Sequence, residues 1–117
     1  MRNTILYTVT VFFMASCNAY ANSYVDHTYV DGNSLLRYYE ADSGPYSAGL
    51  CIGYIIGVAD TLGMNNYSAA TACYASSVVT GQIRDVVISY LKSHPESRHY
   101  AADGVVALAI SEAFPCQ

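Results

Sequence analysis

One apolar stretch constrains the fold of this chain more than any other feature. Residues 46–64, YSAGLCIGYIIGVADTLGM, are hydrophobic almost all round a helix and contain one charged residue, Asp60. A helix with apolar residues on every side is typical of the buried centre of a small domain. Because the stretch is short for a membrane span and ends close to Asp60, we expect a soluble core helix and no membrane span. Gly53 and Gly57 lie four residues apart, a spacing that would let another helix approach closely.

Three other segments have the spacing of amphipathic helices, and none has the alternation of a strand. They are residues 35–41 (LLRYYEA), 81–93 (GQIRDVVISYLKS) and 101–114 (AADGVVALAISEAF). Asn33 or Ser34 can cap the first segment, and Thr80 can cap the second. The apolar stripe of the second segment consists of Ile83, Val86, Val87, Tyr90 and Leu91. We therefore predict an all-α fold, a small single-domain bundle of about four main helices around a central buried helix.

The N-terminal residues have the layout of a Sec signal peptide. Arg2 precedes an apolar run, and a small-x-small cleavage site follows at Ala19-Tyr20-Ala21. We therefore assign residues 1–21 to a signal peptide and residues 22–117 to the helical domain. The segment around Cys17 is loosely similar to a lipoprotein box, but methionine stands where leucine is usual, so lipidation is the less favoured alternative. Both alternatives export the protein, and we expect it in the periplasm.

The exported chain would keep an odd number of cysteines in an oxidising compartment. They are Cys51, Cys73 and Cys116. One disulfide and one free thiol is the simplest outcome, and the pairing stays open at this point. Residues 65–79 show no sustained period, which predicts a long loop that Cys73 could pin.

The charge balance excludes some classes of partner. Lys and Arg number 5 against 9 Asp and Glu, and the formal net charge is −4. Nucleic-acid binding relies on basic clusters, which this chain lacks, so we expect no nucleic acid and favour a basic protein partner. The 12 tyrosines fit a protein interface, because tyrosine contributes a large contact area at a low entropy cost.

Catalytic and metal sites find little support in the sequence. A nucleophile needs a base beside it, yet Cys51 lies in the most apolar part of the chain, where a thiol stays protonated and inert. His94 and His99 are poorly spaced for a metal and lack a nearby thiolate or carboxylate pair. No glycine-rich phosphate motif is present. We therefore expect neither catalysis, nor a cofactor, nor a metal.

A polar turn interrupts the apolar helices near residue 95. It gathers Ser93, His94, Glu96, Ser97, Arg98 and His99 around Pro95. In a structural interpretation, Glu96 and Arg98 satisfy helix-end groups where two antiparallel helices meet. In a functional interpretation, Pro95 stiffens a knob whose charges pair with a partner. The residues alone favour the structural interpretation.

The motifs, taken in order, resemble one known family. The segments that are similar to the Rap/Tai family of immunity proteins are GNSLLRYY, LCIGYIIGVADTL, a cysteine in the loop that follows, VTGQIRDVVISYLKSHPESRHYAA and a terminal EAFPC. They extend from Gly32 to Cys116. The resemblance implies a small helical periplasmic protein, usually a homodimer, that performs no catalysis. Members neutralise peptidoglycan amidases delivered by type VI secretion and block the papain-like Cys–His cleft, in some cases with a protruding loop.

The resemblance also implies roles for particular residues. Family members usually have a cysteine where this chain has Tyr39. If the missing cysteine is the usual partner of Cys51, the resemblance implies a free Cys51 and a Cys73–Cys116 disulfide. As partner-binding residues we favour the turn, namely Ser93, His94, Glu96, Ser97, Arg98 and His99, with the 65–79 loop as the second candidate. A small helical periplasmic acid-stress chaperone is the alternative function.

Overall fold

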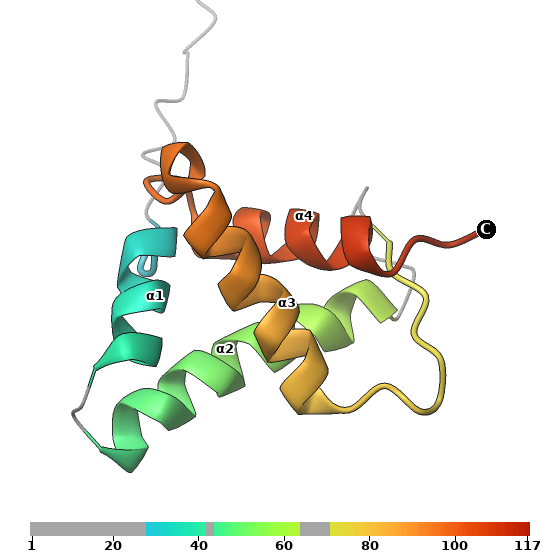
Figure 1. The fold of residues 1–117 in the computed structure, drawn as a ribbon, viewed down its shortest axis with the longest axis horizontal. Helices are drawn as coiled ribbons and strands as arrows, with labels where there is room; N and C mark the ends of the chain where they lie inside the picture. The colour runs from blue at the N-terminus through green and yellow to red at the C-terminus, as the bar shows by residue number, and fades with distance from the viewer. Residues whose placement is uncertain (1–27, 42–43, 64–70) are drawn as a thin grey trace, which may run out of the picture.

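The computed structural model describes residues 28–41, 44–63 and 71–117, and within them the chain is all-helical (Figure 1). Its elements are α1 (Gly32–Glu40), α2 (Pro45–Gly63), α3 (Thr80–Ser93), the single 3₁₀ turn η1 (Pro95–Ser97) and α4 (Ala102–Ala113). The described residues contain no strand, only an isolated antiparallel bridge between Asp31 and Ala101. The prediction of an all-α fold with four main helices is therefore confirmed. The predicted signal peptide and the first part of the 65–79 loop lie outside the described residues.

All four helices contribute to the core. α2 crosses the molecule and contacts α1, α3 and α4, while α3 and α4 also contact each other (Figure 1). The largest fully buried side chains are Leu35, Cys51, Ile55, Val87, Leu91, Val106 and Ile110. No polar or charged residue is buried in the described part of the chain. Apolar packing therefore supplies the stability of this core.

α2 is the central helix, but it is buried along one face. Its buried residues recur at helical spacing and are Cys51, Ile55, Ala59 and Leu62. A Cβ atom built on Gly49, Gly53 or Gly57 would meet no atom within 4 Å, so the strip formed by these glycines is open. The prediction of a central core helix is therefore confirmed. The glycine strip is not covered by another described element, because apolar composition alone does not say how many neighbours a helix has.

By length and composition alone, α2 is also long and apolar enough to cross a membrane, with a mean hydropathy of 1.2. A core helix of a soluble domain passes the same test, and α2 packs against the three other helices. However, only 22% of this stretch is buried inside the molecule. The helix therefore leaves a large apolar surface uncovered.

α1 begins earlier than predicted. The N-cap is Asp31, not Asn33 or Ser34, and the Asp31 carboxylate accepts a hydrogen bond of 2.7 Å from the backbone N–H of Ser34. This hydrogen bond lowers the pKa of Asp31 from its ordinary value. Asn33 and Ser34 lie inside the first turn of α1, and the N–H groups of Gly32 and Asn33 donate to carbonyls of the polar turn.

Gly32 determines how closely α1 approaches the polar turn. Its N–H donates to the carbonyl of Tyr100 (3.1 Å), and the N–H of Asn33 donates to the carbonyl of Arg98 (2.9 Å). A Cβ built on Gly32 would lie 2.9 Å from the Arg98 carbonyl oxygen and 3.0 Å from a methyl group of Leu91. The lack of a side chain at Gly32 therefore lets α1 dock against the turn.

α3 begins one residue earlier than predicted and packs with a different face. Its cap is Val79, whose N–H donates to Oε1 of Gln82 at 2.9 Å, and Thr80 is the first helical residue rather than the cap. Val86 and Tyr90, which belong to the predicted apolar stripe, are partly exposed. The buried residues are Ile83, Val87, Ile88 and Leu91. Packing against α2 and α4 therefore turns the buried face towards Ile88.

Replacing Gly32 by alanine tests the close approach of α1 to the turn. Alanine normally favours a helix over glycine, yet here its Cβ would collide with the backbone of Arg98. We expect Gly32→Ala to lower the free energy of unfolding by about 1–3 kcal/mol. The control is Gly104→Ala on α4, where the added Cβ meets no atom within 4 Å and stability should rise by up to about 1 kcal/mol. Urea denaturation followed by circular dichroism measures both, and an equal rise in both variants would contradict the close approach.

Candidate functional site

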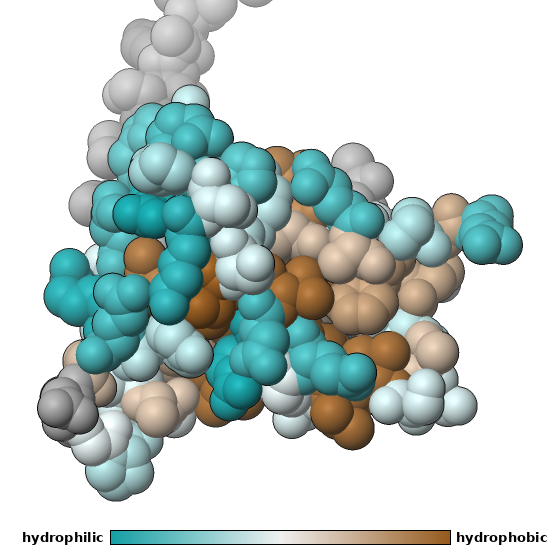
Figure 2. All heavy atoms as spheres, viewed as in Figure 1, coloured by the Kyte–Doolittle hydropathy of each residue, from teal (hydrophilic) through white to brown (hydrophobic). Residues whose placement is uncertain are grey.

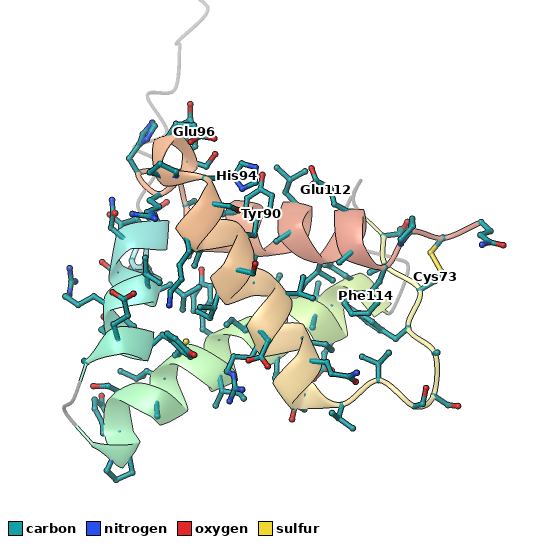
Figure 3. The ribbon with its side chains drawn as sticks, in the orientation of Figure 1. Cys73, Tyr90, His94, Glu96, Glu112 and Phe114 are labelled. Carbon is teal, nitrogen blue, oxygen red and sulfur yellow. A yellow bond between two sulfur atoms is a disulfide. The ribbon has the colours of Figure 1, made fainter. Side chains whose placement is uncertain are left out.

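The predicted partner-binding residues lie at one end of the molecule, where α3 passes through η1 into α4 (Figure 3). Three of them, Ser93, Glu96 and His99, are exposed. Within the described part of the chain, Glu96 makes neither a side-chain hydrogen bond nor an ion pair. The His99 ring is tilted against the ring of Tyr100, with centroids 4.0 Å apart, and Tyr100 is 59% exposed. We call Glu96, His99 and Tyr100 the exposed tip of the turn.

Arg98 has a structural role in the same turn. Its Nε donates to the carbonyl of Leu91, and its Nη2 donates to the carbonyl of Lys92 at 2.9 Å. Carbonyls in the last turn of a helix have no partner inside the helix, so the guanidinium caps the C-terminus of α3. The structural interpretation of the turn is confirmed for Arg98. The charge that remains available at the tip is the carboxylate of Glu96.

Contacts with the end of α3 and within the turn hold three residues in place: Ser93, His94 and Ser97. The Ser93 hydroxyl donates to the carbonyl of Ser89 at 2.9 Å. The His94 ring stacks on the ring of Tyr90, with centroids 4.0 Å and planes 16° apart, and its Nδ1 lies 3.0 Å from the Tyr90 carbonyl. The Ser97 N–H donates to the His94 carbonyl at 3.0 Å. The shape of the turn is therefore set before any partner binds.

The disulfide joins Cys73 to Cys116, with Cα atoms 5.0 Å apart, and confirms the implied pairing. The Cys73 N–H also donates to the carbonyl of Phe114 at 2.9 Å, so residues 71–79 are fastened to the end of α4. Cys51 is free, as expected, and 1% exposed. Burial raises the pKa of the Cys51 thiol, which keeps it protonated and away from solvent.

The second predicted surface is described in part. Of the 65–79 loop the structure describes residues 71–79, which form no helix or strand. Ala75, Ser76 and Ser77 are exposed there. This segment leads into the N-terminus of α3, whereas the polar turn follows its C-terminus (Figure 1). A partner centred on the turn would therefore have to extend along α3 to reach this segment.

An unpredicted groove runs between α3 and α4, beside the turn. Its volume is about 680 Å³, and its walls include Ser89 and Tyr90 of α3 and Glu112 of α4 (Figure 3). Burial raises the pKa of Tyr90, and the carboxylates of Glu112 and Glu96 raise it further. The only signal in the sequence was the apolar stripe of α3, because Val86 and Tyr90 at the edge of that stripe line the groove. Tyr90 also packs against the core with part of its surface.

These side chains suit binding better than catalysis. The tip and the groove offer carboxylates and aromatic rings at the surface, while the free thiol of Cys51 is enclosed in the core. Among residues 28–41, 44–63 and 71–117, no three His, Cys, Asp or Glu side chains lie together in a way that could hold a metal ion. The arrangement therefore fits a basic or hydrogen-bond-donating protein surface.

Replacing Arg98 distinguishes a structural role from a binding role. Arg98→Ala leaves the carbonyls of Leu91 and Lys92 without their donor, so we expect the free energy of unfolding to fall by about 1–2 kcal/mol. Glu96→Ala removes a charge from the same turn without breaking a contact, and should change stability by less than about 0.5 kcal/mol. Urea unfolding measures both variants. Wild-type stability in Arg98→Ala would refute the capping role.

Comparison with known protein families covers almost all of this fold. A family model of the Rap1a immunity proteins matches residues 31–116, from the cap of α1 to the disulfide cysteine that follows α4. No curated protein and no solved structure matches the chain. The matched segment contains the four helices, the polar turn and both cysteines of the disulfide. The resemblance noted in the sequence is thereby confirmed, and the chain belongs to the family of Rap1a immunity proteins.

Proposed function

We propose that this protein is a periplasmic immunity protein that inhibits a peptidoglycan amidase delivered by type VI secretion. Membership of the Rap1a family supports an immunity protein that binds an effector protein. The amidase, its blocked Cys–His cleft and the protection of the producing cell and its siblings are implied by the resemblance to the Rap/Tai family. The observation that carries the proposal is the polar turn, whose tip is exposed, charged and rigid before contact.

The exposed tip has the chemistry to fill a Cys–His cleft. A catalytic cysteine of this kind is a thiolate beside a protonated histidine. The carboxylate of Glu96 can accept a hydrogen bond from that histidine, or from donors that would otherwise hold the oxyanion of the substrate. The rings of His99 and Tyr100 supply contact area at the rim of the cleft.

Rigidity favours tight inhibition, because binding then orders few additional groups. Pro95 begins η1, and the guanidinium of Arg98 attaches the turn to α3. The backbone of Arg98 attaches the turn to α1 through the N–H of Asn33. We propose that the tip enters the cleft in the shape it already has.

We further propose that the protein acts by binding alone, without catalysis, cofactor or metal. Burial of the free thiol of Cys51 supports this proposal, because a nucleophile must reach its substrate. The proposed periplasmic location, reached through a signal peptide at residues 1–21, is the compartment in which a cell-wall amidase acts. It is also one in which a disulfide such as Cys73–Cys116 persists.

An inhibition titration tests this function directly. Residues 22–117 are added to the peptidoglycan amidase encoded beside the protein, and cleavage of peptidoglycan stem peptides is followed. We expect stoichiometric inhibition by the wild type, and weakening of about tenfold or more by Glu96→Ala, because a charge at the centre of a buried contact is lost. The control is Ser76→Arg in the exposed 71–79 segment, which should inhibit like the wild type.

The other outcomes of the titration are equally informative. Inhibition that survives Glu96→Ala but fails with Ser76→Arg would move the site to the 71–79 segment. If the wild type binds no amidase, the immunity proposal is wrong. Protection of client proteins during acidification would then test the acid-stress chaperone.

We also propose that the protein is a homodimer, as the resemblance implies, and that two copies meet at the open face of α2. Beside the glycine strip this face exposes Tyr46 (76%) and Leu50 (39%), and it carries no charge before Asp60. An apolar surface of this kind on a small domain is typical of an interface. Glycines in the contact would let the two helix backbones approach closely.

Gly53→Leu separates dimerisation from folding. Because a Cβ at Gly53 meets open space, the substitution should raise the free energy of unfolding of the monomer by up to about 1 kcal/mol through helix propensity. The same side chain would hold two helices apart, so we expect the dimer to be lost. Light scattering after size-exclusion chromatography measures the mass, with Gly104→Leu on α4 as the control. A dimer that survives Gly53→Leu would place the interface elsewhere.

A further inference from the structure

The groove between α3 and α4, about 680 Å³ in volume, has no role in the function proposed above. Its aliphatic lining, called the floor below, is formed by Val86 of α3 and by Ala109 and Ala113 of α4. In Figure 2, which shows the molecule from the same side as Figure 1, apolar surface (tan and brown) lies between polar side chains (teal). Apolar area that is open to solvent beside a few polar groups is typical of a binding surface.

The two ends of the groove are fixed by different contacts. At one end, Tyr90 and Ser93 lie where α3 enters the polar turn, so the groove adjoins the turn. At the other end lies Phe114, whose ring meets the ring of Tyr74 edge-on with centroids 5.4 Å apart. The Tyr74 hydroxyl donates to the carbonyl of Ala59 at 3.1 Å. Both ends are therefore formed before any partner arrives.

The groove is negatively charged because one of its two carboxylates is not neutralised. Asp85 is paired with Arg84, with N and O atoms 2.6 Å apart. Glu112 is exposed and, within the described part of the chain, makes no ion pair or side-chain hydrogen bond. The carboxylates of Glu112 and of Glu96, which lies in the turn, both raise the pKa of Tyr90 on the opposite wall of the groove. A cation in the groove would therefore be attracted by both glutamates.

We propose that the groove binds an arginine or lysine side chain of the effector protein whose active site the polar turn blocks, an inference that rests on the proposed function. The aliphatic stem of that side chain lies on the apolar floor, between the rings of Tyr90 and Phe114. Its cation meets the carboxylate of Glu112 in a charge-assisted hydrogen bond. A cation is favoured over an apolar anchor because the one unpaired charge in the groove is negative, and the chain as a whole carries −4.

This second contact would give the inhibitor its choice of partner. Ser93 belongs to both the turn and the groove, so one effector can occupy the two sites together. Cys–His clefts of related amidases offer similar chemistry to the tip of the turn. An amidase without a cation opposite Glu112 would bind more weakly, because specificity is a difference between affinities for related partners.

Charge variants of Glu112 test the proposal. Binding of the wild type, Glu112→Gln and Glu112→Lys to the neighbouring amidase is measured by isothermal titration calorimetry at low and high salt. At low salt we expect Glu112→Gln to bind about tenfold more weakly and Glu112→Lys about a hundredfold more weakly, with smaller differences at high salt. The control is Glu40→Gln on α1, which changes the net charge by as much as Glu112→Gln. Glu40 pairs with Lys92 at 3.7 Å, but both side chains are exposed, so the loss of this pair should cost little stability. The affinity of Glu40→Gln should stay within about twofold of the wild type.

A photo-crosslinker identifies the occupant. p-Benzoylphenylalanine in place of Ser89, in the wall of the groove, is irradiated with the amidase present, and the linked peptide is sequenced by mass spectrometry. We expect an amidase peptide that contains arginine or lysine. A crosslink to a second copy of this chain would assign the groove to self-association and overturn the proposal.

The calorimetry separates the failure of this inference from the failure of the proposed function. If the wild type binds and both Glu112 variants bind equally well, the groove has no role and the immunity function stands. If the wild type binds no amidase, both proposals fall together.

Discussion

The contacts of Arg98 hold together parts of the chain that are far apart in sequence. The guanidinium closes the C-terminus of α3, and the carbonyl of the same residue receives the N–H of Asn33 at the start of α1. α1 has 9 residues, which is too short for an isolated helix to be stable in water. It is helical because it docks: Leu35 and Leu36 pack into the core, and backbone hydrogen bonds join its first turn to the polar turn. A polar turn that looks like an interruption of the fold is therefore one of its supports.

The helices and their order could be predicted from the sequence, because the spacing of apolar residues along a helix is a local property. It was harder to predict which face of each helix is buried. α2 is apolar all round, but Gly53 and Gly57 bring no side chain that another element could cover. Ile88 replaces Val86 in the core of α3 because α2 and α4 approach α3 from directions that the sequence does not contain. The pattern thus predicts that a helix is amphipathic more reliably than it predicts where its partners lie.

The candidate site shows the same limit at the level of single residues. Glu96 and Arg98 are close neighbours in the sequence, and both looked available to a partner. Arg98 is occupied because the carbonyls of Leu91 and Lys92 point towards it, which depends on how α3 ends. The groove was beyond sequence reasoning, since it is formed by Tyr90 and Glu112 from helices whose separation only the fold determines. The disulfide was easier, because the resemblance to a family supplied the pairing that counting cysteines left open.

The disulfide also sets the order in which the molecule matures. Cys73 and Cys116 are 43 residues apart, and α3, the turn and α4 all lie between them. The bond cannot form until the ribosome has added Cys116 and the chain has met an oxidant. Before that moment, the Cys73–Cys116 bond does not yet hold the segment of Tyr74 against the segment of Phe114, and this pair of rings closes one end of the groove. A newly made copy is thus a reduced precursor, and a single oxidation, made after translation of all four helices, completes the surface at that end of the molecule.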